Sequence, residues 1–191
     1  QTFQILITEN ILAGLMNKIL IPVSRVRPDI NANDYGIKEL IGDGVSNFAG
    51  SIPGRRHNIQ IASARLNGIL IPPGKIFSFN EAVGEVSART GYDYAYIISE
   101  GRTILGTGGG LCQVSTTVFR AALNSGLPIL KRTAHAYRVH YYEEGGSPVG
   151  FDATVFSPSV DLQFKNDTGS YILVQSVFES EKDTLIFRFY G

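Results

Sequence analysis

Residues 106–123 read Gly-Thr-Gly-Gly-Gly-Leu-Cys-Gln-Val-Ser-Thr-Thr-Val-Phe-Arg-Ala-Ala-Leu, so that a glycine-rich loop runs directly into a helical pattern. Glycines at four of the first five positions permit positive φ and close approach of other groups to the backbone. Beyond Cys112 the apolar residues recur at helical spacing, at Val114, Val118, Ala121 and Ala122. Asn124-Ser125-Gly126 then ends the pattern, with glycine where helices usually stop. The sequence therefore predicts a buried helix with Cys112 at its N-terminal end.

Cys112 is the only cysteine in the chain, so it has no partner for an intramolecular disulfide, and the redox compartment is not fixed by cysteine count. At the start of a helix, free N–H groups and the helix dipole favour a thiolate. A single cysteine is most often a small core residue. The glycine loop before Cys112 favours the alternative, a nucleophile.

Length and composition limit the classes to which this protein can belong. The 191 residues suffice for one domain of ordinary size, and 43% of them are hydrophobic, with eleven Phe and nine Tyr for a core. Seventeen basic residues balance seventeen acidic ones without a long basic run, which argues against nucleic acid as the main partner. No apolar run approaches the ~20 residues that cross a bilayer, and the first residues lack the features of a signal peptide. We expect a soluble piece of a longer protein whose anchor or signal precedes it.

Hydrophobic periodicity predicts an α+β fold. The expected helices are residues 55–66 and the Cys112 helix, with a short helix or turn at 36–42. The expected strands are residues 44–50, 76–79, 96–98, 102–105, 129–131, 137–142 and 152–156, followed by a three-stranded antiparallel meander at 160–165, 171–178 and 184–190. We predict an antiparallel sheet of six or more strands with the Cys112 helix packed on one face.

The segment Gly-Gly-Gly-Leu-Cys-Gln-Val-Ser-Thr-Thr, residues 108–117, resembles the signature of the VanW family, which is named for a protein of vancomycin-resistance clusters. Further stretches agree with the family in the same order, at residues 69–81, 135–142, 151–155 and 161–167, and the resemblance covers roughly residues 48–190. It implies an extracytoplasmic bacterial protein that faces the cell wall and is commonly tethered to the membrane. It also implies peptidoglycan or a wall peptide as partner, with the tether in the part of the protein before this segment.

Family members often carry a peptidoglycan-binding module before the VanW region, and residues 1–30 resemble the tail of such a module. On this interpretation residues 31–191 form the VanW-like domain. The alternative is that residues 1–30 are a plain N-terminal extension of a single domain.

Three of the matching stretches each contribute one group of a thiol active site. A thiol nucleophile needs a base, and the base needs a group that orients it. Cys112, His135 and Asp152 occur in that order, as a helix start followed by two strands. Papain-like and transglutaminase-like enzymes have a similar layout. The alternatives are a core cysteine, a hydrogen-bonded structural histidine and an aspartate that caps a turn.

Five further residues are candidates for substrate or oxyanion binding. Gly109 and Gly110, together with the Cys112 N–H, are candidate oxyanion donors, and Gln113 is a second candidate whose side chain can also point elsewhere. Asn80 either lines the cleft or closes a strand. Arg138 either binds a substrate carboxylate or lies on an exposed strand face.

Metal binding is the other chemistry that these residue types allow. Cys, His and Asp are zinc ligands, yet no short paired spacing such as C-x-x-C is present. We therefore expect no metal and no cofactor.

Two functions stay open at this stage. The first is a cell-wall-associated cysteine peptidase, amidase or acyltransferase acting on peptide or amide bonds, by hydrolysis or transpeptidation. The second is a non-catalytic wall-binding or scaffold module, in which tyrosines stack on sugars. The candidate tyrosines are Tyr92, Tyr94, Tyr96, Tyr137, Tyr141 and Tyr142.

Overall fold

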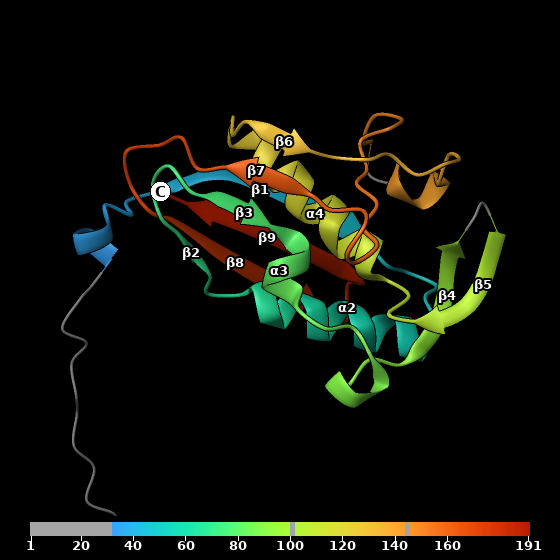
Figure 1. Ribbon diagram of the computed structural model, residues 1–191. Helices are drawn as coiled ribbons and strands as arrows, with labels where there is room; N and C mark the ends of the chain where they lie inside the picture. The colour runs from blue at the N-terminus through green and yellow to red at the C-terminus, as the bar shows by residue number, and fades with distance from the viewer. Residues whose placement is uncertain (1–31, 100–101, 144–145) are drawn as a thin grey trace, which may run out of the picture. The chain divides into compact units, whose positions relative to one another are not determined.

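The computed structural model describes residues 32–99, 102–143 and 146–191, which belong to the unit Ala32–Gly191 (Figure 1). The predicted module tail at residues 1–30 lies outside the described residues.

A four-stranded antiparallel sheet has the strand order β1-β9-β8-β2. Its strands are β1 (Leu40–Asn47), β9 (Thr184–Tyr190), β8 (Ile172–Glu179) and β2 (Leu70–Ile71). Alternate residues of β9 (Leu185, Phe187 and Phe189) are fully buried, while their neighbours are half-exposed. Since successive side chains of a strand point to opposite faces, one face of this sheet supplies the core.

The other described strands form two smaller antiparallel sheets. One has the order β3-β7-β6, from β3 (Ile76–Ser78), β7 (Gln163–Lys165) and β6 (Ile129–Lys131). The other is the hairpin of β4 (Tyr94–Ser99) and β5 (Arg102–Thr107). The remaining short elements are η1 (Ala32–Tyr35), α3 (Phe79–Val83), η2 (Ala88–Thr90) and η3 (His140–Tyr142).

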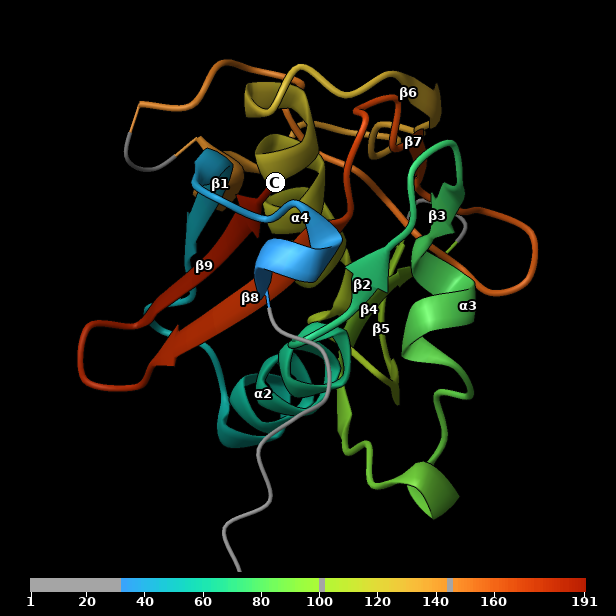
Figure 2. The ribbon, with the colours of Figure 1, turned by 90° about the vertical axis from the view of Figure 1, so that its left-hand side faces the viewer.

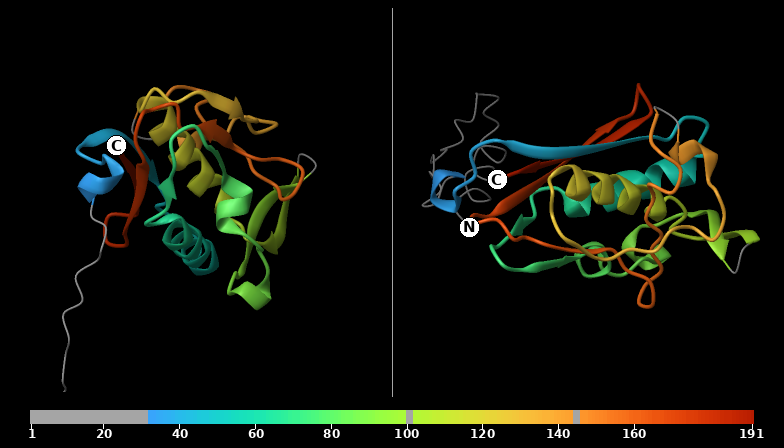
Figure 3. Two further views of the ribbon diagram at one scale, coloured as in Figure 1. Left: turned by 60° about the vertical axis from the view of Figure 1, so that its left-hand side comes forward. Right: turned by 90° about the horizontal axis from the view of Figure 1, so that it is seen from above.

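Helix α4 (Leu111–Asn124) lies between the four-stranded sheet and the three-stranded sheet (Figures 2 and 3). Every residue from Gln113 to Ala122 is buried, polar ones included. Most of its polar side-chain atoms are hydrogen bonded; for example, the Ser115 hydroxyl donates to the Ala153 carbonyl at 2.6 Å, whereas Gln113 Oε1 is buried without a partner among the described residues. Because a buried polar group without a partner is costly, these bonds make an all-round buried helix stable.

Strand β1 approaches α4 very closely at one glycine. A Cβ added to Gly44 would lie 2.2 Å from the Thr117 carbonyl oxygen and 2.6 Å from the Ala121 nitrogen. Only a residue without a side chain allows this helix to cross the strand at that distance.

Helix α2 (Pro53–Leu66) packs beside α4 and against β8. It begins with proline, whose missing N–H costs nothing in the first turn, and it ends before Asn67-Gly68, with Gly68 at φ +87°.

Several predicted elements are confirmed. The α+β class, the helices at 55–66 and 112–123, the 96–105 hairpin and the strand at 129–131 all match the structure. The three C-terminal strands follow one another as predicted, and β8 pairs with β9 as a hairpin. In contrast with the predicted pairing, β7 joins β3 and β6 instead of β8.

Four predictions are wrong. Among the described residues the strands form sheets of four, three and two, so none of these sheets has six strands. Residues 40–42 belong to strand β1 and not to a short helix or turn, because this segment pairs with β9 and Gly42 packs against the end of α4. Residues 137–142 form no strand and end in a 3₁₀ turn, while 152–156 makes only isolated bridges, Thr133 to Thr154 and Phe156 to Val160.

Candidate functional site

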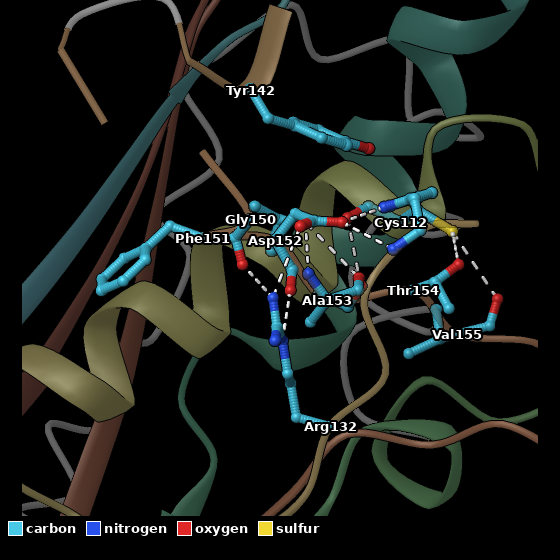
Figure 4. Close-up of polar contacts among 12 residues, drawn as sticks. Cys112, Arg132, Tyr142, Gly150, Phe151, Asp152, Ala153, Thr154 and Val155 are labelled. Carbon is cyan, nitrogen blue, oxygen red and sulfur yellow. Dashed lines mark hydrogen bonds and ion pairs between the residues drawn. The ribbon is translucent and has the colours of Figure 1, made fainter. Parts of the chain in front are cut away.

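Cys112 lies in the first turn of α4 and is partly exposed. Its Sγ is 3.4 Å from the Thr154 hydroxyl oxygen and 3.6 Å from the Val155 carbonyl oxygen, and Figure 4 shows both contacts. Among the described residues the Cys112 N–H has no acceptor, as expected for a first-turn amide. The thiol therefore lies where free backbone donors and the positive end of the helix dipole meet.

The glycine loop before α4 is shaped by contacts that exclude side chains. Gly110 precedes the helix at φ +112°, and a Cβ on Gly109 would lie 2.5 Å from the Tyr96 carbonyl oxygen. The loop is held by Asn58 of α2, a fully buried residue whose amide donates to the carbonyls of Gly109 and Asp93, each at 3.0 Å. Asn58 is a positioning residue that the sequence did not suggest, because it precedes the loop by some fifty residues.

His135 and Asp152 form a doubly bonded pair. The backbone N–H of His135 donates to Asp152 Oδ2 at 2.9 Å, and the imidazole Nδ1 donates to the same oxygen. The His135 side chain is 3% exposed and packs on the Tyr142 ring, with centroids 5.3 Å apart. Two bonds to one carboxylate oxygen fix the ring and leave Nε2 free to face another group.

Two arginines hold the segment that carries Asp152. Arg132 donates to the Asp152 and Gly150 carbonyls, and its guanidinium lies 3.4 Å from Asp152 Oδ1 (Figure 4). Arg120 of α4, only 6% exposed, donates to the carbonyls of Val45, Phe151 and Tyr142. Sequence patterns carry no signal for bonds from a side chain to distant carbonyls, so neither arginine was predicted.

The pKa values of the three groups shift together. Burial raises the pKa of the Cys112 thiol, but hydrogen bonds from His135 and Thr154 outweigh it, and the net pKa is below the ordinary value. Burial lowers the pKa of His135, while hydrogen bonds with Asp152 and Cys112 raise it to about 9. Burial raises the pKa of Asp152, and its bonds from His135 bring the net pKa below the usual range. The pKa of Cys112 is therefore linked to His135, and the pKa of His135 is linked to both Cys112 and Asp152.

A cavity of about 410 Å³ opens beside the thiol. Its wall includes Cys112, His135, Gly109, Gly110 and Asn80, all predicted as site residues. Asp152 lies behind His135 and does not line it. The Asn80 side chain also donates to the Val160 carbonyl at 2.9 Å, so it ties one wall of the cavity to the 157–161 loop.

Gln113 and Arg138 are not brought to this cavity. The Gln113 amide is fully buried and donates to the Ser46 hydroxyl and the Asn47 carbonyl of β1. It points to the sheet because the residue after Cys112 lies on another side of the helix. The Arg138 side chain is 54% exposed and pairs with Glu143 at 2.6 Å.

Among residues 32–99, 102–143 and 146–191, no group of three His, Cys, Asp or Glu side chains is arranged to hold a metal ion. Within the same residues no helix is both long enough and apolar enough to cross a membrane.

Comparison with known proteins places these residues in a family context. The family described as VanW like protein matches residues 54–190. The chain is 33% identical over 162 residues to the uncharacterized protein YoaR of Bacillus subtilis, covering 84% of this chain and 52% of YoaR. It is 31% identical over 125 residues to the vancomycin B-type resistance protein VanW of Enterococcus faecalis, covering 65% of this chain and 46% of that protein. The chain thus spans about half the length of these relatives. No solved structure matches it.

Proposed function

This chain belongs to the VanW family, and on that premise we propose that it is a cell-wall-associated thiol enzyme that acts on peptide or amide bonds. The observation that supports the proposal is the arrangement of Cys112, His135 and Asp152 at the wall of a cavity of about 410 Å³. A buried core cysteine would have neither a lowered pKa nor an open approach.

The first half of the reaction transfers the acyl group to sulfur. The Cys112 thiolate attacks the amide carbonyl carbon, a C–S bond forms, and one C=O electron pair moves to the oxygen. When the carbonyl re-forms, the C–N bond breaks and the leaving nitrogen takes the proton from His135 Nε2. The products are a thioester on Cys112, a free amine and neutral His135.

The second half releases the acyl group. Neutral His135 takes a proton from a water or an amine, which attacks the thioester carbon. The C–S bond breaks, sulfur leaves as thiolate, and His135 is again protonated. Water yields hydrolysis and an amine yields transpeptidation, so the acceptor that reaches the cavity determines the reaction.

Backbone groups supply the electrostatic part of the mechanism. The N–H of Cys112 lies in the first turn of α4, directly after the glycine loop, and has no acceptor within the described segments. Donors of this kind stabilise the oxyanion that forms in the transition state. Asp152 is a positioning group, because it holds His135 with Nδ1 protonated and Nε2 toward the thiol.

The family relationship supports the wall as the place of action. One relative is named as a vancomycin B-type resistance protein, and vancomycin acts on wall synthesis outside the cytoplasmic membrane. We infer an extracytoplasmic, wall-facing enzyme whose partner is peptidoglycan or a wall peptide, with a membrane tether elsewhere in the full-length protein.

Covalent capture tests the catalytic proposal directly. Wild-type protein is incubated with soluble muropeptides, quenched in acid, and analysed by intact mass and by product chromatography. We expect new amine and acyl products, together with a thioester adduct on Cys112 that is absent from Cys112→Ala and strongly reduced in His135→Ala. Muropeptides left unchanged, with no adduct on a folded wild-type protein, would contradict the proposal.

Exposed aromatic side chains favour a second candidate, a wall-binding module without catalysis. Tyr96 (56% exposed), Tyr141 (39%) and Phe156 (58%) line the same cavity, where their faces suit stacking on sugars. Tyr94 and Tyr137 are exposed away from it, and Tyr92 and Tyr142 are buried. Muropeptide binding by Cys112→Ala at wild-type affinity, without product formation by the wild type, would favour this candidate.

A further inference from the structure

Among the described residues, one cation on the cavity wall forms no ion pair with a carboxylate. Arg55 lies in the first turn of α2 and lines the cavity with Cys112 and His135. Within the described part of the chain no carboxylate lies within ion-pair distance of its guanidinium, which donates one bond, to the Ser51 hydroxyl at 2.5 Å. Buried or half-buried arginines are usually paired, so this charge is available to a ligand.

The side chain of Arg55 packs against the glycine loop and Tyr141. Its Cγ lies 3.2 Å from where a Cβ of Gly110 would be, so the absence of a side chain on Gly110 leaves room for it. Its guanidinium carbon is 5.2 Å from the centre of the Tyr141 ring. Gly110 precedes the helix that starts with Leu111 and Cys112. The glycine loop and Tyr141 therefore hold Arg55 on the wall of the cavity that Cys112 also lines.

A row of aromatic rings links Arg55 to the proposed base. The Tyr141 and Tyr142 rings are 4.6 Å apart, and the Tyr142 ring is 5.3 Å from His135. Burial raises the pKa of Tyr142 well above its usual value; the negative charge of Cys112 adds to the rise and the positive charge of Arg55 opposes it. Arg55, Cys112 and Tyr142 all line the same cavity.

The other charges of the cavity are already neutralised. Glu85 on the opposite wall pairs with Arg89 at 2.5 Å and accepts from the Ser87 hydroxyl at 2.8 Å. Cys112 and His135 offset each other as an ion pair. Arg55 is thus the uncompensated charge among the described residues of the wall, and it is positive.

We propose that Arg55 binds a carboxylate of the substrate, so that the enzyme prefers acyl donors with a free carboxylate close to the scissile amide over the same peptides without one. A guanidinium suits this task because its planar fork of N–H donors matches a carboxylate. The inference rests on the proposed function, since it assigns the substrate class of the same site.

A matched pair of electrophiles tests the assignment. Bromoacetyl-alanine and bromoacetyl-alaninamide alkylate thiolates with the same chemistry, sulfur displacing bromide, and differ only in the terminal carboxylate. The second-order rate constants for Cys112 are measured with both reagents on wild type, Arg55→Gln, Arg55→Lys and the control Lys182→Gln. Lys182 lies at the β8–β9 turn with its side chain 72% exposed. The ratio of the two rates cancels any change in thiolate content.

We expect the acid-to-amide ratio of the wild type to fall about tenfold in Arg55→Gln, the size of a charge-assisted hydrogen bond, to be partly retained in Arg55→Lys, and to be unchanged in Lys182→Gln. A fast Cys112 with the same ratio in wild type and Arg55→Gln would overturn the assignment of Arg55 and leave the thiol mechanism standing. A wild-type Cys112 that reacts with neither reagent would overturn the thiol mechanism and this assignment together. Circular dichroism of each variant confirms that the comparison is made on folded protein.

Discussion

His135 and Asp152 are joined at one oxygen: the backbone N–H and the imidazole Nδ1 of His135 both donate to Asp152 Oδ2. Asp152 thus fixes both the imidazole of His135 and the backbone from which that side chain projects. The arrangement holds the imidazole by Nδ1, and its pKa is linked to that of Cys112. Four predictions depend on this pair or on the scaffold around it.

The alkylation rate of Cys112 should depend on pH through His135. The net pKa of Cys112 is below its ordinary value, because bonds from His135 and Thr154 outweigh burial. Iodoacetamide should therefore alkylate Cys112 at a lower pH than it alkylates an ordinary thiol. In His135→Ala the apparent pKa should rise by a unit or more, so that the rate at pH 6 falls about tenfold or more. Stopped-flow or mass-detected alkylation from pH 4 to 10 measures this, and equal profiles for both proteins would contradict it.

Stability should depend on pH differently once the thiol is removed. In Cys112→Ala the hydrogen bond and the charge of Asp152 remain, and both raise the pKa of His135 against the burial that lowers it. We expect these contributions to keep the pKa above its ordinary 6.5. The folded protein then keeps a proton that the unfolded chain releases, so the free energy of unfolding should be highest below pH 6.5 and be lost as pH rises through the folded pKa. We expect a loss of about 1 kcal/mol or more by pH 8.5.

The wild type provides the contrast for that measurement. Its His135 pKa is about 9, and the proton taken up by His135 is offset by the proton lost from Cys112. The free energy of unfolding should therefore be nearly flat from pH 6.5 to 8.5. Urea titrations at several pH values compare the two proteins, and the double variant Cys112→Ala/His135→Ala should also be flat. A steep decline in the wild type alone would mean that the thiol does not share its proton with His135.

Replacing Gly44 with alanine should disrupt the close contact between β1 and α4. A Cβ there would meet the Thr117 carbonyl oxygen at 2.2 Å, and both backbones are held by regular hydrogen bonds. We expect Gly44→Ala to lower the free energy of unfolding by about 3 kcal/mol. Gly169→Ala is the matched control, because nothing lies within 4 Å of its Cβ and its φ is not in the positive region; it should change stability by less than about 0.5 kcal/mol. Equal stabilities in thermal and urea unfolding would contradict the close crossing.

Arg120 should stabilise the folded protein through its hydrogen bonds to backbone carbonyls. It is 6% exposed and donates to the carbonyls of Val45, Phe151 and Tyr142. Arg120→Met keeps the approximate volume but leaves these acceptors without donors, at a cost of about 3 kcal/mol. Arg138→Met removes a half-exposed arginine paired with Glu143 and should cost less than about 1 kcal/mol. Urea unfolding of both variants measures the difference, and similar values would mean that the carbonyls find other donors.

Local patterns explain why much of the fold was predictable. The helical spacing after Cys112 and the stop at Asn124-Ser-Gly126 identify α4. The helical pattern of residues 55–66 identifies α2. The 96–105 hairpin follows from two apolar runs and a short turn. In each case the interactions that stabilise the element join residues near one another in the chain, so composition and periodicity report them.

Elements whose pattern serves distant contacts were misjudged. Residues 36–42 suggested a short helix or turn, whereas residues 40–42 lie in β1, where Gly42 packs against the end of α4. The alternation at Tyr137–Tyr142 suggested a strand, whereas Tyr142 is buried against His135 from a 3₁₀ turn. The alternation of residues alone does not show whether a side chain packs on a sheet or against a distant residue such as His135.

The sequence by itself determined the family, the α+β class and the three residue types in order: a thiol at a helix start, then a histidine, then an aspartate. Only the tertiary structure decided that these groups meet beside a cavity, that Gln113 turns to β1 and Arg138 to Glu143, and that Asn58, Arg120 and Arg132 hold the segments in place. The physical reason is the range of the interactions. Helix and turn preferences act over a few residues, whereas the site depends on side chains bonding backbone groups that are far away in the chain and close only after folding.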